Sequence, residues 1–325
     1  MLAHNGKLHF VYAGDPGDSR SCSPFSITHN LYKFLAQRMP VVYHEWTACY
    51  DIELGPSDVF LGHPHYDPNT IVQRTFRRNQ PCKARCLIHP FHHRRVEDNF
   101  PFDHLARAAD KIFSICGPYW YDTIGDTQFA HWREKMVRLD MAVDISQWPY
   151  RKTTFNEPGN RGVVYVGSGM PQKNVGFLTE IASRLPKVRF DWYGGSGDHS
   201  LAKLKNCHVE GWVAFTPEKV AQICYRNDLF VNVSISDANP TTLLEFGLAS
   251  GIVPIVTETS GYWRDECFAN IPMDRDGAVA IIKDWLGRPT EELMARSLAN
   301  RRVCEERYNW SRFCETVWAG LEPLL

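Results

Sequence analysis

Two carboxylates in the second half of the chain have a spacing that suits a long polar ligand. Asp237 and Glu245 stand eight positions apart in LFVNVSISDANPTTLLEFGLASGIVPIVT, which reads as a buried strand, a loop, a helix and another strand. Pro240 suits the first turn of that helix, which places Asp237 in the preceding loop and Glu245 about one and a half turns into the helix. We expect both side chains to face one ligand at different points. Because apolar residues surround Glu245, its carboxylate needs a polar partner.

The same region offers groups that bind anions. Asn239 suits the helix cap, so the backbone N–H groups of Thr241 and Thr242 are expected to be available for phosphate oxygens. Lys173 stands in the loop GSGMPQKN, near the start of another expected helix, together with Ser168. A cation at a helix N-terminus opposes the helix dipole unless an anionic ligand lies between them. The alternative is that Lys173 is a solvated surface lysine. Without evidence from other residues, this alternative is the better interpretation of Lys173.

A further loop, at residues 13–18, follows the first expected strand and contains Gly14 and Gly17. Small residues let a backbone approach a phosphate closely. The spacing is not Gly-x-Gly-x-x-Gly, and no acidic residue stands about 20 residues further on, so the dinucleotide-binding fingerprint is absent. A nicotinamide-dependent enzyme is therefore disfavoured, and an ordinary tight turn explains this loop equally well.

The elements that must position these residues alternate between strands and helices, which predicts an α/β fold with parallel sheets. We expect two doubly wound, Rossmann-like domains that face a central cleft, with ligands at the carboxyl ends of the strands. The polar stretch 148–161 (WPYRKTTFNEPGNR) reads as a linker, so the domains are expected at 1–150 and 151–310. Expected strands are KLHFVYAG, VVYHEW, DVFLGH, RCLIH, KIFSICG and MVRLDMA in the first domain, and GVVYVG, VRFDWYG, LFVNVS and IVPIVT in the second.

Taken together, these segments resemble the retaining glycosyltransferases of the GT-B fold that carry a Glu-x7-Glu motif (group 1, family 4-like). Asp237 and Glu245 stand at the two Glu positions, and Lys173 stands at the lysine of the family's Gly-Arg-x4-Lys segment. MAVDISQWP is similar to the interdomain marker, DKIFSICGPYWYDTI to the serine-containing strand and helix, and RCLIHP to the strand that ends in a histidine, here His89. ERYNWSRFCETVWAGL is similar to the closing helix, which implies that residues 311–325 cross back to the first domain.

The resemblance implies a role for each residue. The second domain would hold a nucleoside diphosphate sugar, with Glu245 on the ribose, Asp237 on the sugar, and Lys173 on the diphosphate with the helix start at Pro240, Thr241 and Thr242. His89 would touch the sugar or orient the acceptor, and its alternative is a histidine bonded to backbone. The implied reaction retains the anomeric configuration and needs no cofactor or metal. The acceptor would lie on the first domain and would be a glycan, a glycolipid or a small molecule. The pathway would be the biosynthesis of glycans, glycolipids or polysaccharides.

Three positions depart from the family pattern: Ser168 replaces an Arg, Asp237 replaces a Glu, and Ala142 replaces a Gly. They motivate a second hypothesis, a glycosyltransferase-like protein that binds a nucleotide sugar without turnover.

Two other clusters contain metal-ligand residue types. Cys82, Cys86, His89, His92 and His93 are closely spaced, but no second ligand pair follows, and the segment reads as a buried strand. Asp274-Arg275-Asp276 precedes an expected helix, where acidic residues commonly cap. We expect no metal at either place.

Charge and hydropathy restrict the partners. Lys plus Arg number 36 against 37 Asp plus Glu, and nucleic-acid binding needs an excess of cations, so no nucleic-acid partner is expected. No apolar run approaches the roughly 20 residues of a membrane span, no secretory signal is recognised, and the ten cysteines are scattered, so a cytoplasmic protein with reduced thiols is expected. Between Ile71 and Val96 stand seven Lys or Arg and no acid. Such a patch is suited to peripheral contact with the anionic inner face of a membrane, or it is a solvated face balanced by acids elsewhere.

Overall fold

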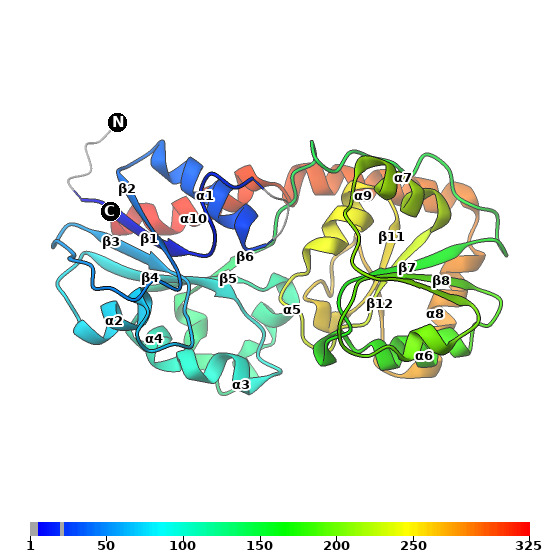
Figure 1. Ribbon diagram of the computed structural model, residues 1–325, viewed down its shortest axis with the longest axis horizontal. Coiled ribbons are helices and arrows are strands. Elements are labelled where there is room, and N and C mark those ends of the chain that lie inside the picture. The colour runs from blue at the N-terminus through cyan, green and yellow to red at the C-terminus, as the bar shows by residue number, and fades with distance from the viewer. Residues whose placement is uncertain (1–5, 20–22) are drawn as a thin grey trace. The chain divides into compact units, whose positions relative to one another are not determined.

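The computed structural model describes residues 6–19 and 23–325, and the chain divides into two compact units. Unit 1 comprises Met1–Met141 and Trp310–Leu325, and unit 2 comprises Ala142–Asn309. Each unit is built on its own six-stranded parallel sheet (Figure 1). The α/β class predicted from the alternation of strands and helices is confirmed.

Unit 1 has the strand order β2-β1-β3-β4-β5-β6. Every residue of β1 is buried, as expected for a central parallel strand covered on both faces. Figure 1 shows α1 and α10 on one face of this sheet and α2 and α4 on the other. The strands are β1 (Leu8–Tyr12), β2 (Val41–Glu45), β3 (Val59–Gly62), β4 (Ala84–Pro90), β5 (Lys111–Ile115) and β6 (Met136–Leu139), and the helices are α1 (Phe25–Ala36), α2 (Ile71–Arg78), α3 (Val96–Asn99), α4 (Asp103–Ala108), α5 (Gly117–Asp122) and α10 (Trp310–Leu321).

Unit 2 has the strand order β12-β11-β10-β7-β8-β9. Helices α6 and α8 pack together, and α9 packs against the helical segment Leu243–Ala249. The strands are β7 (Gly162–Val166), β8 (Arg189–Tyr193), β9 (Cys207–Glu210), β10 (Leu229–Asn232), β11 (Val253–Thr257) and β12 (Ala269–Ile271), and the helices are α6 (Val175–Ser183), α7 (Pro217–Arg226), α8 (Arg275–Gly287) and α9 (Thr290–Arg307).

Two strands of unit 2, β9 and β12, were not predicted. They form the two edges of the sheet and have four and three residues. An edge strand pairs on one side only and is partly exposed, so it lacks the continuous apolar run by which the central strands were recognised.

The stretch 148–161 is not a free linker, which corrects the sequence interpretation. Lys152 is 1% exposed and forms an ion pair of 2.9 Å with Asp228, which is fully buried. Arg161 is also buried, and its guanidinium donates to the carbonyl of Leu286 at 3.0 Å, near the end of α8. The polar residues that suggested a linker therefore fasten this stretch to unit 2.

Helix α10 closes unit 1, although it comes from the other end of the chain. It packs against α1 and β6, and Figure 1 shows it beside α1. The approach is close at Gly320, where a Cβ atom would lie 2.5 Å from the Phe113 ring on β5. None of the helices in the described part of the chain has the length and apolar character that a membrane crossing requires.

Candidate functional site

Lys173 and Asp237 meet at the carboxyl edge of the unit 2 sheet. Lys173 follows β7 and Asp237 follows β10, and these two strands are neighbours. The Lys173 ammonium donates to the Asp237 carboxylate, and the two side chains are 21% and 13% exposed. Lys173, whose charge is unfavourable toward the helix dipole, is therefore neutralised by Asp237, and both side chains are partly open to solvent.

Backbone contacts hold the Lys173 loop against the loop that carries Asp237. The amide of Ile235 donates to the carbonyl of Gln172 at 2.9 Å, and the Asn174 side chain donates to the carbonyl of Val233 at 3.3 Å. Asn174 has a φ of +56°, a left-handed conformation that asparagine tolerates, and α6 begins directly after it. The bend at Asn174 brings the short turn Pro171–Lys173 alongside the end of β10.

The Asp237 loop is fixed from its other side by β11 and the turn that follows it. The hydroxyl groups of Thr257 and Thr259 both donate to the carbonyl of Ser234, at 2.7 and 2.5 Å. The Asp237 amide donates to the carbonyl of Thr259 at 3.0 Å, and the Ser234 hydroxyl donates to its carboxylate at 3.3 Å. These bonds fix the position of the carboxylate before any ligand binds.

Glu245 lies in a π-helix, which the sequence did not predict. Helical geometry begins at Thr241, one residue later than the predicted first-turn position of Pro240, and the wider π-helical turns run from Leu243 to Ala249. The Glu245 side chain is 5% exposed. Asn239, the predicted cap, has a left-handed φ of +70°. Because π-helical segments occur often at functional sites, this geometry marks the Glu245 helix as part of the candidate site.

Thr242 and Ser168 connect this helix to the end of β7. The Thr242 hydroxyl donates to the carbonyl of Val166 at 3.2 Å, and the Tyr165 hydroxyl donates to the carbonyl of Ser168 at 2.8 Å. Burial raises the pKa of Tyr165, and the negative charge of Asp237 raises it further. Tyr165 therefore stays a neutral donor beside the ion pair.

The loop after β8 extends the site toward the edge strand. The Gly169 amide donates to the carbonyl of Ser196 at 2.7 Å, and the Asp198 amide donates to the carbonyl of Gly169 at 2.8 Å. A Cβ atom at Gly169 would lie 2.7 Å from those backbone atoms, so only glycine permits this approach. The loops after β7 and β8 are thus bonded to each other through their backbones.

Trp212 is a candidate that the sequence interpretation missed. It follows β9 and is 72% exposed, and a Cβ atom at Gly195 would lie 2.7 Å from its indole ring. Strands β10, β7, β8 and β9 are consecutive in the sheet, so Asp237, Lys173, the Ser196 loop and Trp212 follow one another along one edge. At about 4.8 Å per strand this line spans about 14 Å. Recognition of β9 would have identified Trp212 from the sequence.

His89 belongs to unit 1, where it is 3% exposed near the end of β4. Its Nε2 atom has no hydrogen-bond partner within the described residues. The rings of His63, Phe102 and Trp132 surround it at centroid distances of 6.4, 6.3 and 5.8 Å. Burial lowers the pKa of His89 to about 3 and the pKa of His63 to about 4, so both rings are neutral at pH 7. His89 is hydrogen-bonded to the backbone at Pro90, as the alternative expects, and Nε2 is the ring atom that this bond leaves without a partner.

The loop with Gly14 and Gly17 has the geometry of a tight turn. The Asp15 carboxylate accepts the Gly17 amide at 2.8 Å, and the Asp15 carbonyl accepts the Asp18 amide at 2.9 Å. Gly14 has a φ of +90°, which requires glycine. Because Asp15 occupies the Gly17 amide and adds negative charge, the geometry favours the turn over a phosphate site.

The Asp274-Arg275-Asp276 triplet and the cluster around Cys86 and His89 were the two places with metal-ligand residue types. Asp274 caps α8 by accepting the Gly277 amide at 2.8 Å. Cys86 is fully buried in β4, and burial raises the pKa of its thiol to about 12. Across residues 6–19 and 23–325, no three His, Cys, Asp or Glu side chains are grouped as metal ligands would be.

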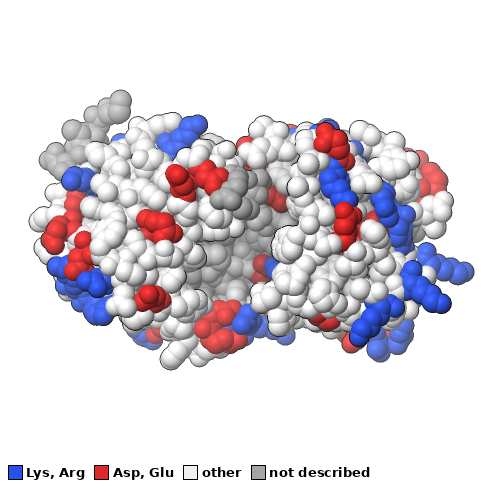
Figure 2. All heavy atoms as spheres, viewed as in Figure 1, with Lys and Arg blue, Asp and Glu red and all other residues white. Residues whose placement is uncertain are grey.

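Some of the basic side chains in the segment 71–96 form ion pairs with acidic side chains. Arg74 and Arg78 pair with Asp51 at 2.6 and 2.9 Å, and Arg95 pairs with Glu97 at 3.1 Å. On the face of unit 1 shown in Figure 2, basic and acidic side chains lie next to one another. This arrangement favours the balanced, solvated face over a patch for anionic lipid.

The chain is similar to solved structures of glycosyltransferases. The pneumococcal O-GlcNAc transferase GtfA, in complex with UDP and GlcNAc, matches with a TM-score of 0.55 and 19% identity; the match covers 83% of this chain and 57% of GtfA. Anabaena HepE in complex with UDP and glucose matches with a TM-score of 0.64 and 12% identity, and the match covers 98% of this chain and 99% of HepE. The catalytic domain of Arabidopsis thaliana starch synthase IV, bound to ADP and acarbose, matches with a TM-score of 0.68 and 10% identity. That match covers 98% of this chain and 99% of the starch synthase chain. No protein-family model and no curated protein sequence matches. The two parallel sheets and these likenesses establish the GT-B fold of glycosyltransferases.

Proposed function

We propose that this chain is a retaining glycosyltransferase that moves a sugar from a nucleoside diphosphate sugar to a hydroxyl acceptor in glycan or glycolipid biosynthesis. The observation that carries the proposal is the Lys173–Asp237 pair at the carboxyl edge of a doubly wound sheet, beside the helix that contains Glu245. Ligands of such sheets bind at this edge. The similar structures of GtfA, HepE and starch synthase IV hold UDP or ADP, which supports a nucleotide donor.

Asp237, Lys173 and Trp212 follow the ends of β10, β7 and β9, an order that suits the sugar, the diphosphate and the base of the donor, and Glu245 lies on the helix after β10. Asp237 receives the sugar hydroxyls, Lys173 with the Thr241 and Thr242 amides receives the diphosphate, and Glu245 accepts hydrogen bonds from the ribose. Trp212 supplies a flat, exposed ring on which the base stacks. The role of Trp212 was not among the roles implied by the sequence resemblance, and we add it because Trp212 follows β9 at this edge of the sheet.

Lys173 acts on the charge that grows as the diphosphate leaves. The acceptor oxygen attacks the anomeric carbon on the face from which the diphosphate departs, the bond from that carbon to the phosphate oxygen breaks, and the acceptor proton passes to this oxygen. A fixed cation aimed at the developing charge is worth several kcal/mol in a dehydrated site. The chain's own groups suffice for this scheme, and we propose that it needs no divalent metal.

Stereochemistry tests the proposal. Proton NMR of the first-formed product is expected to show an α linkage from an α-linked donor, because attack and departure share one face. A β linkage would refute the retaining mechanism. Activity is expected to survive exhaustive chelation, and a loss that only a divalent ion restores would refute the metal-free scheme.

The alternative is a protein that binds a nucleotide sugar without turning it over, since Ser168 and Asp237 depart from the family pattern. Hydrolysis of radiolabelled UDP-, GDP- and ADP-sugars separates the two functions. Slow release of free sugar supports the enzyme, whereas nucleotide binding with no release supports the alternative. A thermal-shift screen of the three nucleotides identifies the base, because a ligand bound only by the folded state raises its stability.

A further inference from the structure

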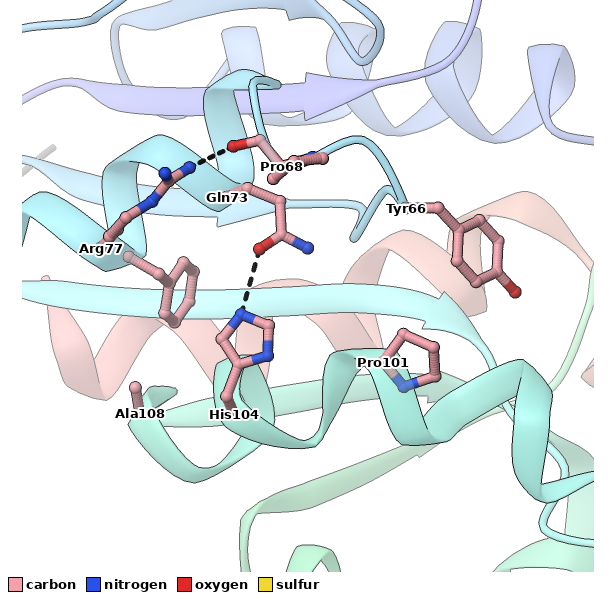
Figure 3. A pocket seen from close by; sticks show the side chains of 8 residues that line it. Tyr66, Pro68, Gln73, Arg77, Pro101, His104 and Ala108 are labelled. Carbon is pink, nitrogen blue, oxygen red and sulfur yellow. Dashed lines mark hydrogen bonds between the residues drawn. The ribbon is translucent and has the colours of Figure 1, made fainter.

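A groove on unit 1 has a lining that no step of the proposed reaction uses. It has a cavity volume of about 440 Å³ and lies between α2 and α4 (Figure 3). Pockets of about 300–1,000 Å³ are typical of small-molecule sites. The lining residues are Tyr66, Pro68, Gln73, Phe76, Arg77, Pro101, His104 and Ala108.

A hydrogen-bond relay fixes the polar groups of the groove. The Gln73 amide group donates to the carbonyl of His65 at 2.8 Å, so its carbonyl oxygen faces His104 and accepts from Nε2 at 3.0 Å. Gln73 is 8% exposed and thus held on both sides. In the tautomer with Nε2 as the donor, Nδ1 is the acceptor atom of the His104 ring, and it has no hydrogen-bond partner among the described residues. Figure 3 shows His104 and Gln73 facing each other from the two helices.

The two ends of the groove differ. Arg77 donates to the carbonyl of Pro68, and none of the ion pairs among the described residues includes Arg77. At the other end the Tyr66 ring is 61% exposed, and its hydroxyl donates to the carbonyl of Asp98 at 3.2 Å. The lining therefore combines an acceptor, unpaired donors, an open aromatic face and no acid.

We propose that this groove binds one sugar ring of the acceptor, which makes the acceptor an oligosaccharide or glycoconjugate. Neighbouring hydroxyls of a sugar act as donor and acceptor at once, which matches His104 Nδ1 and the Arg77 guanidinium. The C–H face of a sugar packs on an aromatic ring such as Tyr66. This inference rests on the proposed function, because a glycosyltransferase with a glycan acceptor needs a site for the part of that glycan that does not react.

Contacts within unit 1 connect the groove to the edge that holds His89. The Tyr66 ring lies 4.8 Å from the Phe102 ring, which lies 6.3 Å from the His89 ring. Tyr66 also stands four residues after the end of β3 and three residues after His63. These ring contacts link Tyr66 to the His89 end of β4, so a glycan placed over Tyr66 would extend from the groove toward that end of the strand.

The test is saturation-transfer NMR on the full chain with maltotriose, cellotriose, chitotriose and mannotriose, each beside its monosaccharide. At least one trisaccharide is expected to bind more tightly than its monosaccharide. Tyr66→Ala is expected to weaken that binding by about tenfold, and His104→Phe, which keeps a ring and removes the acceptor, by a similar factor. Tyr225→Ala is the matched control, because Tyr225 is a tyrosine of unit 2 with 73% exposure.

Trisaccharide binding that all three variants retain would overturn the inference, as would no trisaccharide binding or displacement of the bound trisaccharide by uridine. Calorimetry with UDP, GDP and ADP on the same samples keeps the two proposals apart. Nucleotide binding without glycan binding refutes the groove alone, and no nucleotide binding refutes the proposed function.

Discussion

Lys173 and Asp237 are bonded to each other in the free protein although they stand 64 positions apart in the sequence. A donor that places its diphosphate on Lys173 and its sugar on Asp237 must enter between two groups that already neutralise each other. Binding then replaces one ion pair by contacts to the ligand, and the net gain in affinity is small. In the proposed reaction the benefit would come at the transition state, where the leaving diphosphate carries more charge than the bound donor.

Lys173→Ala is therefore expected to lower kcat by at least about a hundredfold and to change donor affinity much less. Lys283→Ala, which removes an exposed lysine on α8, is the control for net charge. Single-turnover kinetics and calorimetry measure the two effects. Equal losses in kcat and affinity, or none, would remove Lys173 from this role. Because the residues are in contact, the double variant with Asp237→Asn is expected to be less impaired than the product of the single effects.

Glu245→Gln is expected to weaken UDP binding by about tenfold or more, because charge-assisted hydrogen bonds to the ribose hydroxyls are lost. The sharper readout is discrimination between UDP and 2′-deoxy-UDP by calorimetry. The wild-type chain should prefer UDP, and the variant should bind both alike. A variant that still discriminates would place Glu245 elsewhere on the ligand.

Trp212→Ala is expected to lower the affinity for UDP by about 1–3 kcal/mol, the usual value of one base stacked on an aromatic ring. Affinity for pyrophosphate, which has no base, should not change. Trp212→Phe should restore most of the loss, because it keeps an aromatic face. If UDP and pyrophosphate weaken together, Trp212 shapes the loop and does not hold the base.

Lys152→Met is expected to destabilise unit 2 by about 3–5 kcal/mol, because it leaves the fully buried Asp228 charged and without its cation. Asp228 also accepts the backbone amides of Asn156 and Gly162, at 2.9 and 3.1 Å, so it cannot turn outward. Urea unfolding measures the loss. Arg184→Ala, which breaks the exposed pair with Asp276, is the control and should cost less than about 1 kcal/mol. Similar costs for both variants would show that Asp228 is satisfied without the lysine.

Acid should destabilise unit 1 through its buried histidines. The unfolded chain binds protons on histidine near pH 6.5, whereas the folded chain holds His63 neutral to about pH 4 and His89 to about pH 3. Between pH 6.5 and pH 4 the unfolded state binds more protons, so the free energy of unfolding falls as pH falls, by about 1.4 kcal/mol per pH unit for each histidine. His89→Phe should reduce this slope by one proton in urea unfolding between pH 7 and pH 5. An unchanged slope would show that His89 is protonated in the folded chain.

The sequence patterns predicted those parts of the fold that depend on buried apolar runs. Ile27, Leu31, Phe34 and Leu35 recur at helical spacing in α1, and all of them except the partly exposed Phe34 are fully buried. The same criterion fails at β9 and β12, whose residues pair on one side and keep polar side chains in solvent. Trp212 was missed for that reason, since its place at the edge follows from β9.

The site shows a different limit of sequence reasoning. Spacing along the chain brought Asp237 and Glu245 to attention, but it cannot show that a π-helix carries Glu245, because the wider turn depends on packing around Leu243–Ala249. The pairing of Lys173 with Asp237 depends on β7 and β10 being neighbours, a fact of sheet order. Similarly, the polar residues of 148–161 read as solvated until their partners, Asp228 and the end of α8, are known.

The return of α10 to unit 1 sets the order in which the two units can be completed during translation. Unit 2 is a single continuous stretch of chain, whereas unit 1 needs residues from both ends of the sequence. A ribosome has therefore delivered all of unit 2 before it delivers the helix that covers α1 and β6. Until then those apolar surfaces have no intramolecular cover, so premature termination before Trp310 would harm unit 1, the earlier half of the chain, more than the unit in which the chain stops.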